Sequence, residues 1–135
     1  MSSSPNQQPM RDMNLSVFGV ALETFSNQHR QVEIAILYDA FGETIDYYSR
    51  RDPFVARLAA AHHGLIFVSA QARLQWMKLG NIKNVEITAT ELDSLTVEIA
   101  EEIYLTVVVT HASIDTPFLG ALDVLVSQLR AEIDV

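Results

Sequence analysis

One segment, from Asp52 to Gly80, constrains the fold more than any other part of this sequence. Asp52 followed by Pro53 is typical of a helix start, because aspartate caps the first turn and proline suits the first helical position. Gly80 is typical of the left-handed residue at which a helix stops, so the pattern predicts one long helix over residues 54–79. Apolar residues occupy almost its whole circumference, whereas a surface helix of a monomer normally carries one apolar stripe. The fold must therefore cover this helix on more than one side.

A helical wheel divides the predicted helix into a side that packs on a sheet, two apolar flanks and a polar line. The sheet side is predicted to consist of Val55, Ala59, His62, Ile66 and Ser69. One flank consists of Leu58, Ala61, Leu65, Val68 and Ala72. The other flank consists of Ala56, Ala60, Phe67 and Leu74. The polar line consists of Arg57, Gly64, Gln71 and Lys78.

One sheet cannot cover both flanks of a helix. Burying a Leu or Val side chain is worth roughly 1.5–3 kcal/mol, so a flank left in water would forgo several kcal/mol and favour association. Two arrangements would cover such a flank: the terminal helices of the same domain, or a second chain. Each terminal helix is short and has a single apolar stripe, so we expect a second chain.

The rest of the sequence alternates between helical and strand patterns around this helix. Helical spacing of apolar residues predicts a first helix over roughly residues 13–28, with Asn14 as its N-cap. Alternation of period two predicts a hairpin of strands 31–39 and 43–49. Three more alternating blocks, joined by short turns at 92–93 and 101–102, predict an antiparallel meander. Thr116-Pro117 then predicts the start of the last helix.

The predicted order of elements is α-β-β-α-β-β-β-α, in one α+β domain over residues 12–135. The expected sheet is five-stranded and antiparallel, with the long helix across one face and the two terminal helices on the other. Residues 1–11 are predicted to form a disordered polar tail.

Composition argues against several classes of function. The sequence has 17 Asp and Glu residues against 9 Lys and Arg residues, for a formal net charge of -8. Nucleic-acid phosphates need clustered positive charge, so neither nucleic acid nor an anionic membrane is an expected partner. No apolar run approaches the ~20 residues of a membrane span, so no membrane insertion is expected. The polar N-terminus lacks the pattern of a signal peptide and the chain lacks cysteine, so a cytoplasmic protein is predicted.

No set of residues in the sequence predicts catalysis. The glycines are spread through the chain and do not build a phosphate-binding loop. His62 and His63 are adjacent, so on a helix they point about 100° apart and do not hold one metal ion together. The pair Glu101-Glu102 is interpreted as a solvated hairpin tip. We therefore expect a protein that is not an enzyme, with no catalytic residue, cofactor or metal site.

Four features resemble the Roadblock/LC7 family, and the resemblance spans about residues 12–133. A strand that ends in aspartate before a glycine-containing turn corresponds to Ala35–Gly42. The long helix corresponds to residues 54–79, and the aliphatic end of the meander corresponds to residues 105–109. A glycine near the start of the last helix corresponds to Gly120.

This resemblance implies a protein that acts by binding other proteins. Family proteins pair their long helices and join their third strands edge to edge into one continuous sheet. They bind small Ras-like GTPases as regulators or scaffolds, or serve as adaptors in larger assemblies, and similar bacterial proteins act beside a small GTPase in motility and polarity systems. We therefore expect a homodimer, or a heterodimer with another Roadblock-type protein, that binds a small Ras-like GTPase.

Two groups of residues are candidates for these contacts. The predicted dimer interface consists of Ala61, Leu65, Val68, Ala72, Val85, Ile87 and Ala89. The candidate partner contacts are Arg57, Gln71, Trp76 and Lys78. If a GTPase is the partner, no arginine finger is expected, and Arg50 and Arg51 are the nearest candidates for one.

Two other functions remain open at the level of sequence. One is an adaptor or heterodimer subunit that holds an assembly together and is indifferent to nucleotide. The other is a small-ligand sensor, which would need a cavity with convergent polar groups.

Overall fold

The structure, a computed structural model, describes residues 11–134. In chain order its elements are α1 (Val17–Gln28), β1 (Val32–Asp39), β2 (Thr44–Ser49), α2 (Pro53–Trp76), β3 (Asn84–Thr88), β4 (Leu92–Ala100), β5 (Ile103–Thr110) and α3 (Thr116–Ile133). The predicted order and the α+β class are confirmed. Of the predicted tail, residues 1–10 lie outside the described residues.

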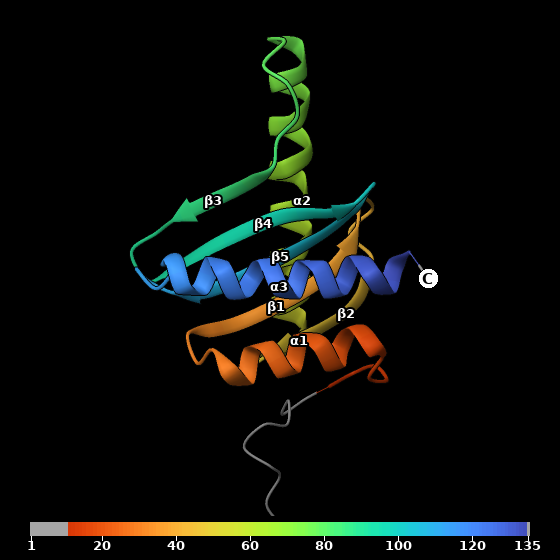
Figure 1. Ribbon diagram of the computed structural model, residues 1–135, viewed down its shortest axis with the longest axis vertical. Helices are drawn as coiled ribbons and strands as arrows, with labels where there is room; N and C mark the ends of the chain where they lie inside the picture. The colour runs from red at the N-terminus through yellow and green to blue at the C-terminus, as the bar shows by residue number, and fades with distance from the viewer. Residues whose placement is uncertain (1–10, 135) are drawn as a thin grey trace, which may run out of the picture.

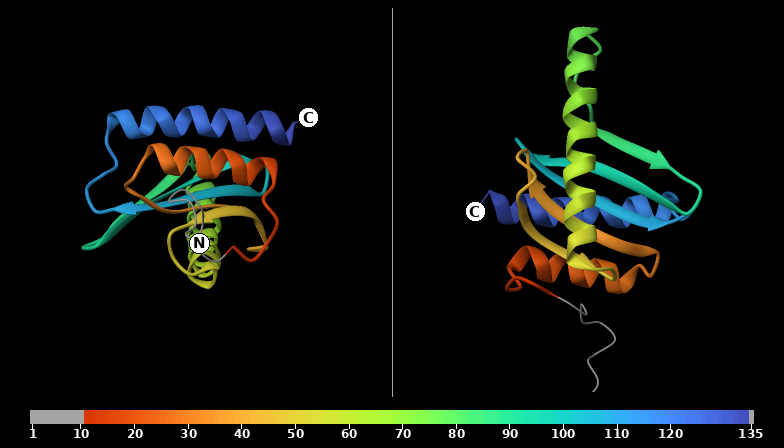
Figure 2. Two further views of the ribbon diagram at one scale, coloured as in Figure 1. Left: turned by 90° about the horizontal axis from the view of Figure 1, so that it is seen from below. Right: turned by 180° about the vertical axis from the view of Figure 1, so that it is seen from behind.

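One antiparallel sheet with the strand order β2-β1-β5-β4-β3 organises the molecule. The helix α2 carries the chain from β2, at one edge of the sheet, to β3, at the other edge. The meander then brings β5 back to the centre, where it pairs with β1. α2 lies on one face of the sheet, whereas α1 and α3 cover the other face (Figures 1 and 2), as predicted.

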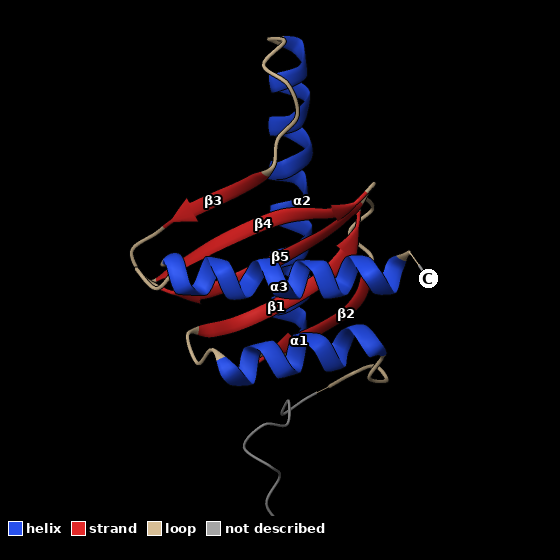
Figure 3. Cartoon of the chain, in the orientation of Figure 1, coloured by secondary structure: helices blue, strands red, loops and turns tan. Residues whose placement is uncertain are grey.

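Side-chain caps set the starts of the terminal helices, drawn in blue in Figure 3. α1 is capped by Ser16 and not by the predicted Asn14, because the Ser16 hydroxyl accepts a hydrogen bond from the third amide of the helix. α3 is capped in the same way by Asp115, one residue before the predicted Thr116. The predicted turn at Leu92-Asp93 is also wrong, because both residues pair with β5 as the first part of β4.

The end of α2 is set by Lys78 and not by Gly80. The helix ends at Trp76, and Lys78 adopts a left-handed conformation with φ 59°. The amide of Leu79 then donates to the Leu74 carbonyl at 2.9 Å, which satisfies one of the free carbonyls of the last turn. Gly80 also has a positive φ of 97°, but it lies in the loop that follows.

The sheet buries one apolar cluster on each face, because the side chains of a strand alternate between its faces. The cluster under α1 and α3 includes Leu22, Phe25, Ala35, Leu37, Leu105, Leu122, Leu125 and Leu129. The cluster under α2 consists of Ile34, Ile36, Tyr38, Tyr47, Ala56, Ala60, Phe67, Tyr104 and Val108. The helix α2 therefore contributes only small residues and one aromatic ring to the core.

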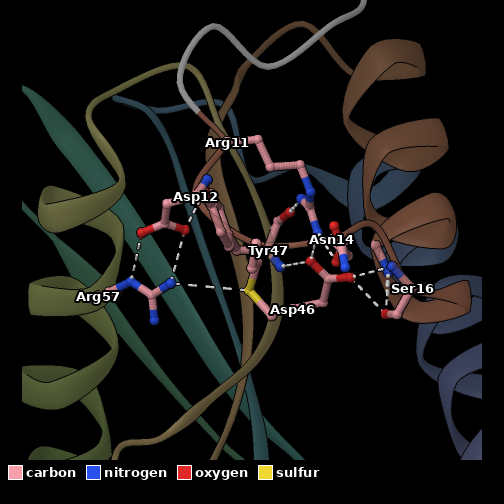
Figure 4. A network of polar contacts seen from close by, with 9 residues as sticks. Arg11, Asp12, Asn14, Ser16, Asp46, Tyr47 and Arg57 are labelled. Atoms are coloured by element: carbon pink, nitrogen blue, oxygen red, sulfur yellow. Dashed lines mark hydrogen bonds and ion pairs between the residues drawn. The ribbon is translucent and has the colours of Figure 1, made fainter.

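A buried carboxylate, Asp46 of β2, ties the start of α1 to the sheet (Figure 4). It accepts hydrogen bonds from the backbone amide and the hydroxyl of Ser16, at 2.8 and 2.5 Å. It also accepts from the Tyr47 amide at 2.8 Å and pairs with Arg11. Burial raises the pKa of Asp46, but the hydrogen bonds from Ser16, Arg11 and Tyr47 together outweigh burial and hold the pKa below its usual value. The carboxylate is therefore charged and fully engaged at neutral pH.

Gly19 of α1 leaves no room for a side chain beside this carboxylate. A Cβ atom built on Gly19 would overlap the Asp46 carboxylate and would lie 2.7 Å from Leu15 Cδ1. The contact between α1 and β2 therefore depends on glycine at this position.

We predict that Gly19→Ala lowers the free energy of unfolding by more than about 1 kcal/mol, because the new methyl group displaces a buried, hydrogen-bonded carboxylate. Gly120→Ala is the matched control. Gly120 lies in α3 with no atom within 4 Å of the site of a new Cβ, so this variant should gain about 0.5–1 kcal/mol from helix propensity. Urea denaturation measures both variants, and equal effects of the two substitutions would contradict the prediction.

Candidate protein-interaction surface

The helix α2 rests on the sheet through a narrow stripe of small residues. Ala56 and Ala60 are fully buried, and a Cβ on Gly64 would lie only 3.1 Å from the ring of Tyr38. Phe67 completes the stripe, with its ring centroid 4.9 Å from that of Tyr104. Gly64 thus lets the helix backbone approach the Tyr38 ring closely, while Phe67 packs against the Tyr104 ring.

The sheet side predicted from the helical wheel is therefore wrong. Val55 and Ile66, which were assigned to the sheet, are 40% and 42% exposed, whereas the buried residues belong to a predicted flank. The wheel shows apolar residues all round, and size, not polarity, decides which side fits against the tyrosine rings.

Large apolar side chains of α2 point away from the sheet. Their exposed fractions include 71% for Leu65 and 85% for Trp76. The other exposed large apolar residues of α2 are Phe54, Val55, Leu58, Ile66 and Val68. α1 and α3 lie on the opposite face of the sheet, so the terminal helices do not cover this surface. Within residues 11–134, the terminal helices therefore leave this surface uncovered.

The C-terminal part of α2 projects beyond the sheet. Figure 1 shows α2 crossing the strands and continuing past β3, the strand at that edge. β3 pairs with β4 on one side only, and within residues 11–134 no strand pairs with its other side. An edge strand of this kind invites pairing with another chain. β3 is thus an unpaired edge among the described residues, and the exposed end of α2 lies next to it.

Two grooves run along α2 on its opposite sides. The groove toward β3, which we call the β3-side groove, has a volume of about 360 Å³. Its lining includes Val55, Ala59 and Ile66 from α2, together with Ile87 and Ala89. Most of its lining is apolar, but it also contains two residues of opposite charge, Arg51 and Asp93. His63 lines it as well, with ring nitrogens 2.7 Å from the Ala59 carbonyl and 2.8 Å from the Ser94 hydroxyl.

The groove on the other side of α2, the turn-side groove, lies against the turn between β1 and β2. Its lining there is Ala40, Phe41, Gly42, Ala61, Gly64, Leu65 and Val68. The predicted interface residues Ala61, Leu65 and Val68 therefore lie on the side of α2 that faces away from Ile87 and Ala89. The structure does not bring the two predicted halves of the interface together. The residues of α2 that share a groove with β3 are instead Val55, Ala59 and Ile66.

The candidate partner contacts divide into two kinds. Arg57 forms an ion pair with Asp12 at 2.8 Å and lies over the Tyr47 ring (Figure 4). Gln71 accepts a hydrogen bond from the Ile82 amide at 2.8 Å, so it fastens the loop after α2 to the helix. Trp76 and Lys78, in contrast, are exposed at the projecting end of α2. These two have their side chains available to another protein.

The two arginines before α2 differ, because Arg50 is hydrogen-bonded to the domain whereas the Arg51 side chain is 45% exposed. Arg50 donates hydrogen bonds to the carbonyls of Val32 and Ser26, at 2.7 and 3.2 Å. Arg51 pairs with Glu33 at 3.3 Å.

Within residues 11–134, no group of three or more acidic, histidine or cysteine side chains is placed to hold a metal ion. Over the same residues, no helix is long and apolar enough to cross a membrane.

Comparison with known proteins finds similarity in structure and not in sequence. No family model and no curated protein matches the sequence. The structure resembles a Roadblock/LC7 domain from Streptomyces avermitilis, with a TM-score of 0.77 at 13% identity, over 86% of this chain and 97% of that one. It resembles MglB of Myxococcus xanthus, with a TM-score of 0.79 at 7% identity, over 90% of this chain and 98% of that one. It also resembles the gliding protein MglB of Thermus thermophilus, with a TM-score of 0.73 at 13% identity, over 84% of this chain and 86% of that one.

The geometry defines a class of α+β domain in which one helix crosses a five-stranded sheet and exposes its apolar outer side. The particular fold is that of the Roadblock/LC7 domain, as the resemblance in sequence predicts.

Because α2 packs closely on the sheet, substitutions at two adjacent alanines should differ in their effect on the free energy of unfolding. Ala60→Leu should destabilise the protein by roughly 1–3 kcal/mol, because it overpacks a fully buried position between the helix and the sheet. Ala61 is the next residue and is exposed, so Ala61→Leu should change the free energy of unfolding by less than about 0.5 kcal/mol. Thermal or urea unfolding distinguishes them. A destabilisation confined to Ala61→Leu would show that the helix is seated differently.

Proposed function

We propose that this protein is a cytoplasmic, non-catalytic dimer that binds a small Ras-like GTPase and regulates or positions it in bacterial motility or polarity. The observation that carries the proposal is the apolar helix α2, which lies uncovered on the sheet and projects past an unpaired edge strand.

A two-fold axis through the β3 edge explains the projecting helix. Two copies of β3 related by such an axis run antiparallel, so they can join their sheets into one. The part of α2 that extends beyond one sheet then lies over the sheet of the other copy. The two α2 helices pass side by side in opposite directions, each on the β3 side of the other.

In this arrangement the β3-side groove receives the helix end of the second copy. The groove is apolar, and the helix end carries Trp76 and Met77, which are 85% and 50% exposed in the single chain. Large aromatic side chains at the centre of an interface contribute strongly to binding. The proposed dimer interface thus combines Val85, Ile87 and Ala89 with the flank Val55, Ala59 and Ile66 of α2.

We predict that the protein is a dimer of the 15.1 kDa chain, and that Ile66→Glu breaks the dimer whereas Leu65→Glu does not. Ile66 lines the β3-side groove and Leu65 the turn-side groove, so the adjacent substitutions place the same charge on opposite sides of α2. An unpaired charge buried in the interface should raise the dissociation constant about 100-fold or more. Light scattering after gel filtration measures the mass of each variant. A monomeric wild type would refute the dimer, and loss of the dimer only in Leu65→Glu would place the interface on the other side.

The GTPase part of the proposal rests on the family resemblance in the order of elements and on the structural likeness to MglB, one example of which is a gliding protein. The hydrogen bonds of Arg50 to the Val32 and Ser26 carbonyls hold this guanidinium against the domain. They support the proposal that this protein contributes no arginine finger to the GTPase.

For a small Ras-like GTPase encoded beside this gene, we predict binding that differs between its GDP-bound and GTP-bound forms. Nucleotide-dependent binding is expected because the loops that contact partners are ordered by the γ-phosphate. Isothermal titration with each form measures the difference, and Arg51→Ala should leave the rate of hydrolysis in the complex unchanged. Equal binding to both forms would favour the nucleotide-indifferent adaptor. A rate that falls a hundredfold in Arg51→Ala would reveal an arginine finger.

A further inference from the structure

The turn-side groove continues past Val68 into a second, larger hollow along α2. The two parts share Ala40 and Val68, and the second part has a volume of about 610 Å³. Its floor contains Phe67, Val68, Ala72 and Tyr104, and its far wall contains Glu98, Glu101 and Glu102. The groove is therefore apolar at one end and acidic at the other.

The two turns that form the wall are fastened to each other. The Ala40 amide, in the turn between β1 and β2, donates a hydrogen bond of 3.0 Å to the Glu102 carbonyl, in the turn between β4 and β5. Glu102 has a positive φ of 61° in the two-residue turn that joins β4 to β5. Glu101 and Glu102 are thus presented by a turn that is fastened to its neighbour, and Glu98 by the strand β4 itself.

Among the described residues no cation forms an ion pair with this wall, and the Arg130 guanidinium donates to the backbone carbonyls of Ile99 and Glu98, at 2.8 and 3.3 Å. Within the described residues, the ion pairs involve Asp46, Glu33, Asp12 and Asp93, and none involves Glu98, Glu101 or Glu102. The described residues that line this part of the groove include no lysine, arginine or histidine. Burial raises the pKa of Tyr104, and the nearby charges of Glu98 and Glu102 raise it further, which places these carboxylates close to the groove floor.

At the apolar end, Phe41 stands almost free of the domain. It lies at the tip of the turn between β1 and β2, and 91% of its surface is exposed. Together with Leu65, which is 71% exposed, it borders a hollow of about 290 Å³. A phenylalanine in this position gives nothing to the core, and aromatic residues of this kind are enriched at the centres of interfaces.

We propose that the turn-side groove binds an amphipathic segment of a partner protein, with a large apolar side chain between Phe41, Leu65 and Val68 and with lysine or arginine residues beside Glu98, Glu101 and Glu102. The aliphatic part of a lysine or arginine side chain would lie along Val68 and Ala72 while its charge reaches the carboxylates. Complementary charge of this kind sets specificity and speeds association.

Segments of this same chain are poor occupants of the groove. Residues 1–10 contain no lysine or arginine, so they cannot complement the acidic end. In the proposed dimer, on which this step rests, the second copy approaches α2 from the β3 side and leaves the turn-side groove open. A different, basic protein is therefore the occupant that the groove selects.

The test uses the full chain, labelled with ¹⁵N, and two synthetic amphipathic helices as probes. One peptide is built from leucine and lysine, and the other from leucine and glutamate. The leucine–lysine peptide should bind and shift the amide resonances of residues around Ala40, Val68 and Glu102, whereas the leucine–glutamate peptide should not bind. Failure of the leucine–lysine peptide to bind, or shifts confined to other surfaces, would overturn the proposal.

Matched variants separate the groove from net charge alone. The triple variant Glu98→Gln/Glu101→Gln/Glu102→Gln should weaken binding of the leucine–lysine peptide at least about tenfold, as loss of several charge-assisted contacts predicts. The control triple Glu23→Gln/Glu91→Gln/Glu132→Gln changes the net charge equally and should leave the affinity within about twofold. Equal weakening by both triples would show that the peptide senses only the overall charge and would overturn the proposal.

A further pair of variants tests the apolar end and separates this site from the dimer. Phe41→Ser should weaken binding about tenfold, and Val124→Ser, an exposed position on α3, should not. Light scattering on the same samples reports the dimer independently. A monomeric protein that still binds the peptide in this groove would refute the dimer and keep the site. A dimer whose affinity for the peptide is unchanged in Phe41→Ser would keep the dimer and refute the site.

Discussion

The close contact between α2 and two tyrosine rings is the constraint on which the rest of the structure depends. Tyr38 and Tyr104 lie in the cluster under α2, where Gly64 lets the helix backbone lie against the Tyr38 ring and Phe67 packs against the Tyr104 ring. The small residues Ala56 and Ala60 are buried in the same cluster. The Tyr38 hydroxyl forms its hydrogen bond within the sheet, with the Thr106 hydroxyl at 2.7 Å, so it needs no polar partner from the helix. A helix seated on its small residues must turn its large apolar side chains outward.

That outward surface explains why the helix is so long. A helix that served only its own sheet could end where the sheet ends, yet α2 continues past β3 as an apolar rod. The free energy lost by exposing Trp76 and its neighbours in a single chain is recovered only if another surface covers them. The unpaired β3 edge offers a place for that surface to attach. The exposed end of α2 and the unpaired edge of β3 therefore lie on the same side of the molecule, where one second surface could cover both. The acidic groove lies on the other side.

Periodicity and local caps were enough to predict the order of elements and the sheet, because these features depend on short stretches of sequence such as Asp52-Pro53. The choice of Ser16 over Asn14 as the cap of α1 was not predictable, since it depends on Asp46, which lies 30 residues away in sequence. The side of α2 that meets the sheet was not predictable either. An all-round apolar helix carries no polarity signal for its orientation, and the tyrosines that decide the matter come from other strands. For the same reason the sequence grouped Leu65 and Val68 with β3, although the crossing of α2 over the strands places them on the opposite side.

The unequal charge of the two grooves indicates which of them suits a second copy of this chain. A two-fold interface places the same patch of both copies around one axis. The β3-side groove is mostly apolar, and its two charged residues, Arg51 and Asp93, have opposite signs, so self-association there buries apolar surface without an excess of like charge. The turn-side groove carries Glu98, Glu101 and Glu102 without a neutralising cation, and a two-fold contact there would bring two such sets of carboxylates together. Like charges at an interface cost several kcal/mol and suppress wrong partners. The acidic side of α2 thus disfavours a second copy and favours a basic protein of another kind, which lets one helix make two contacts that do not compete.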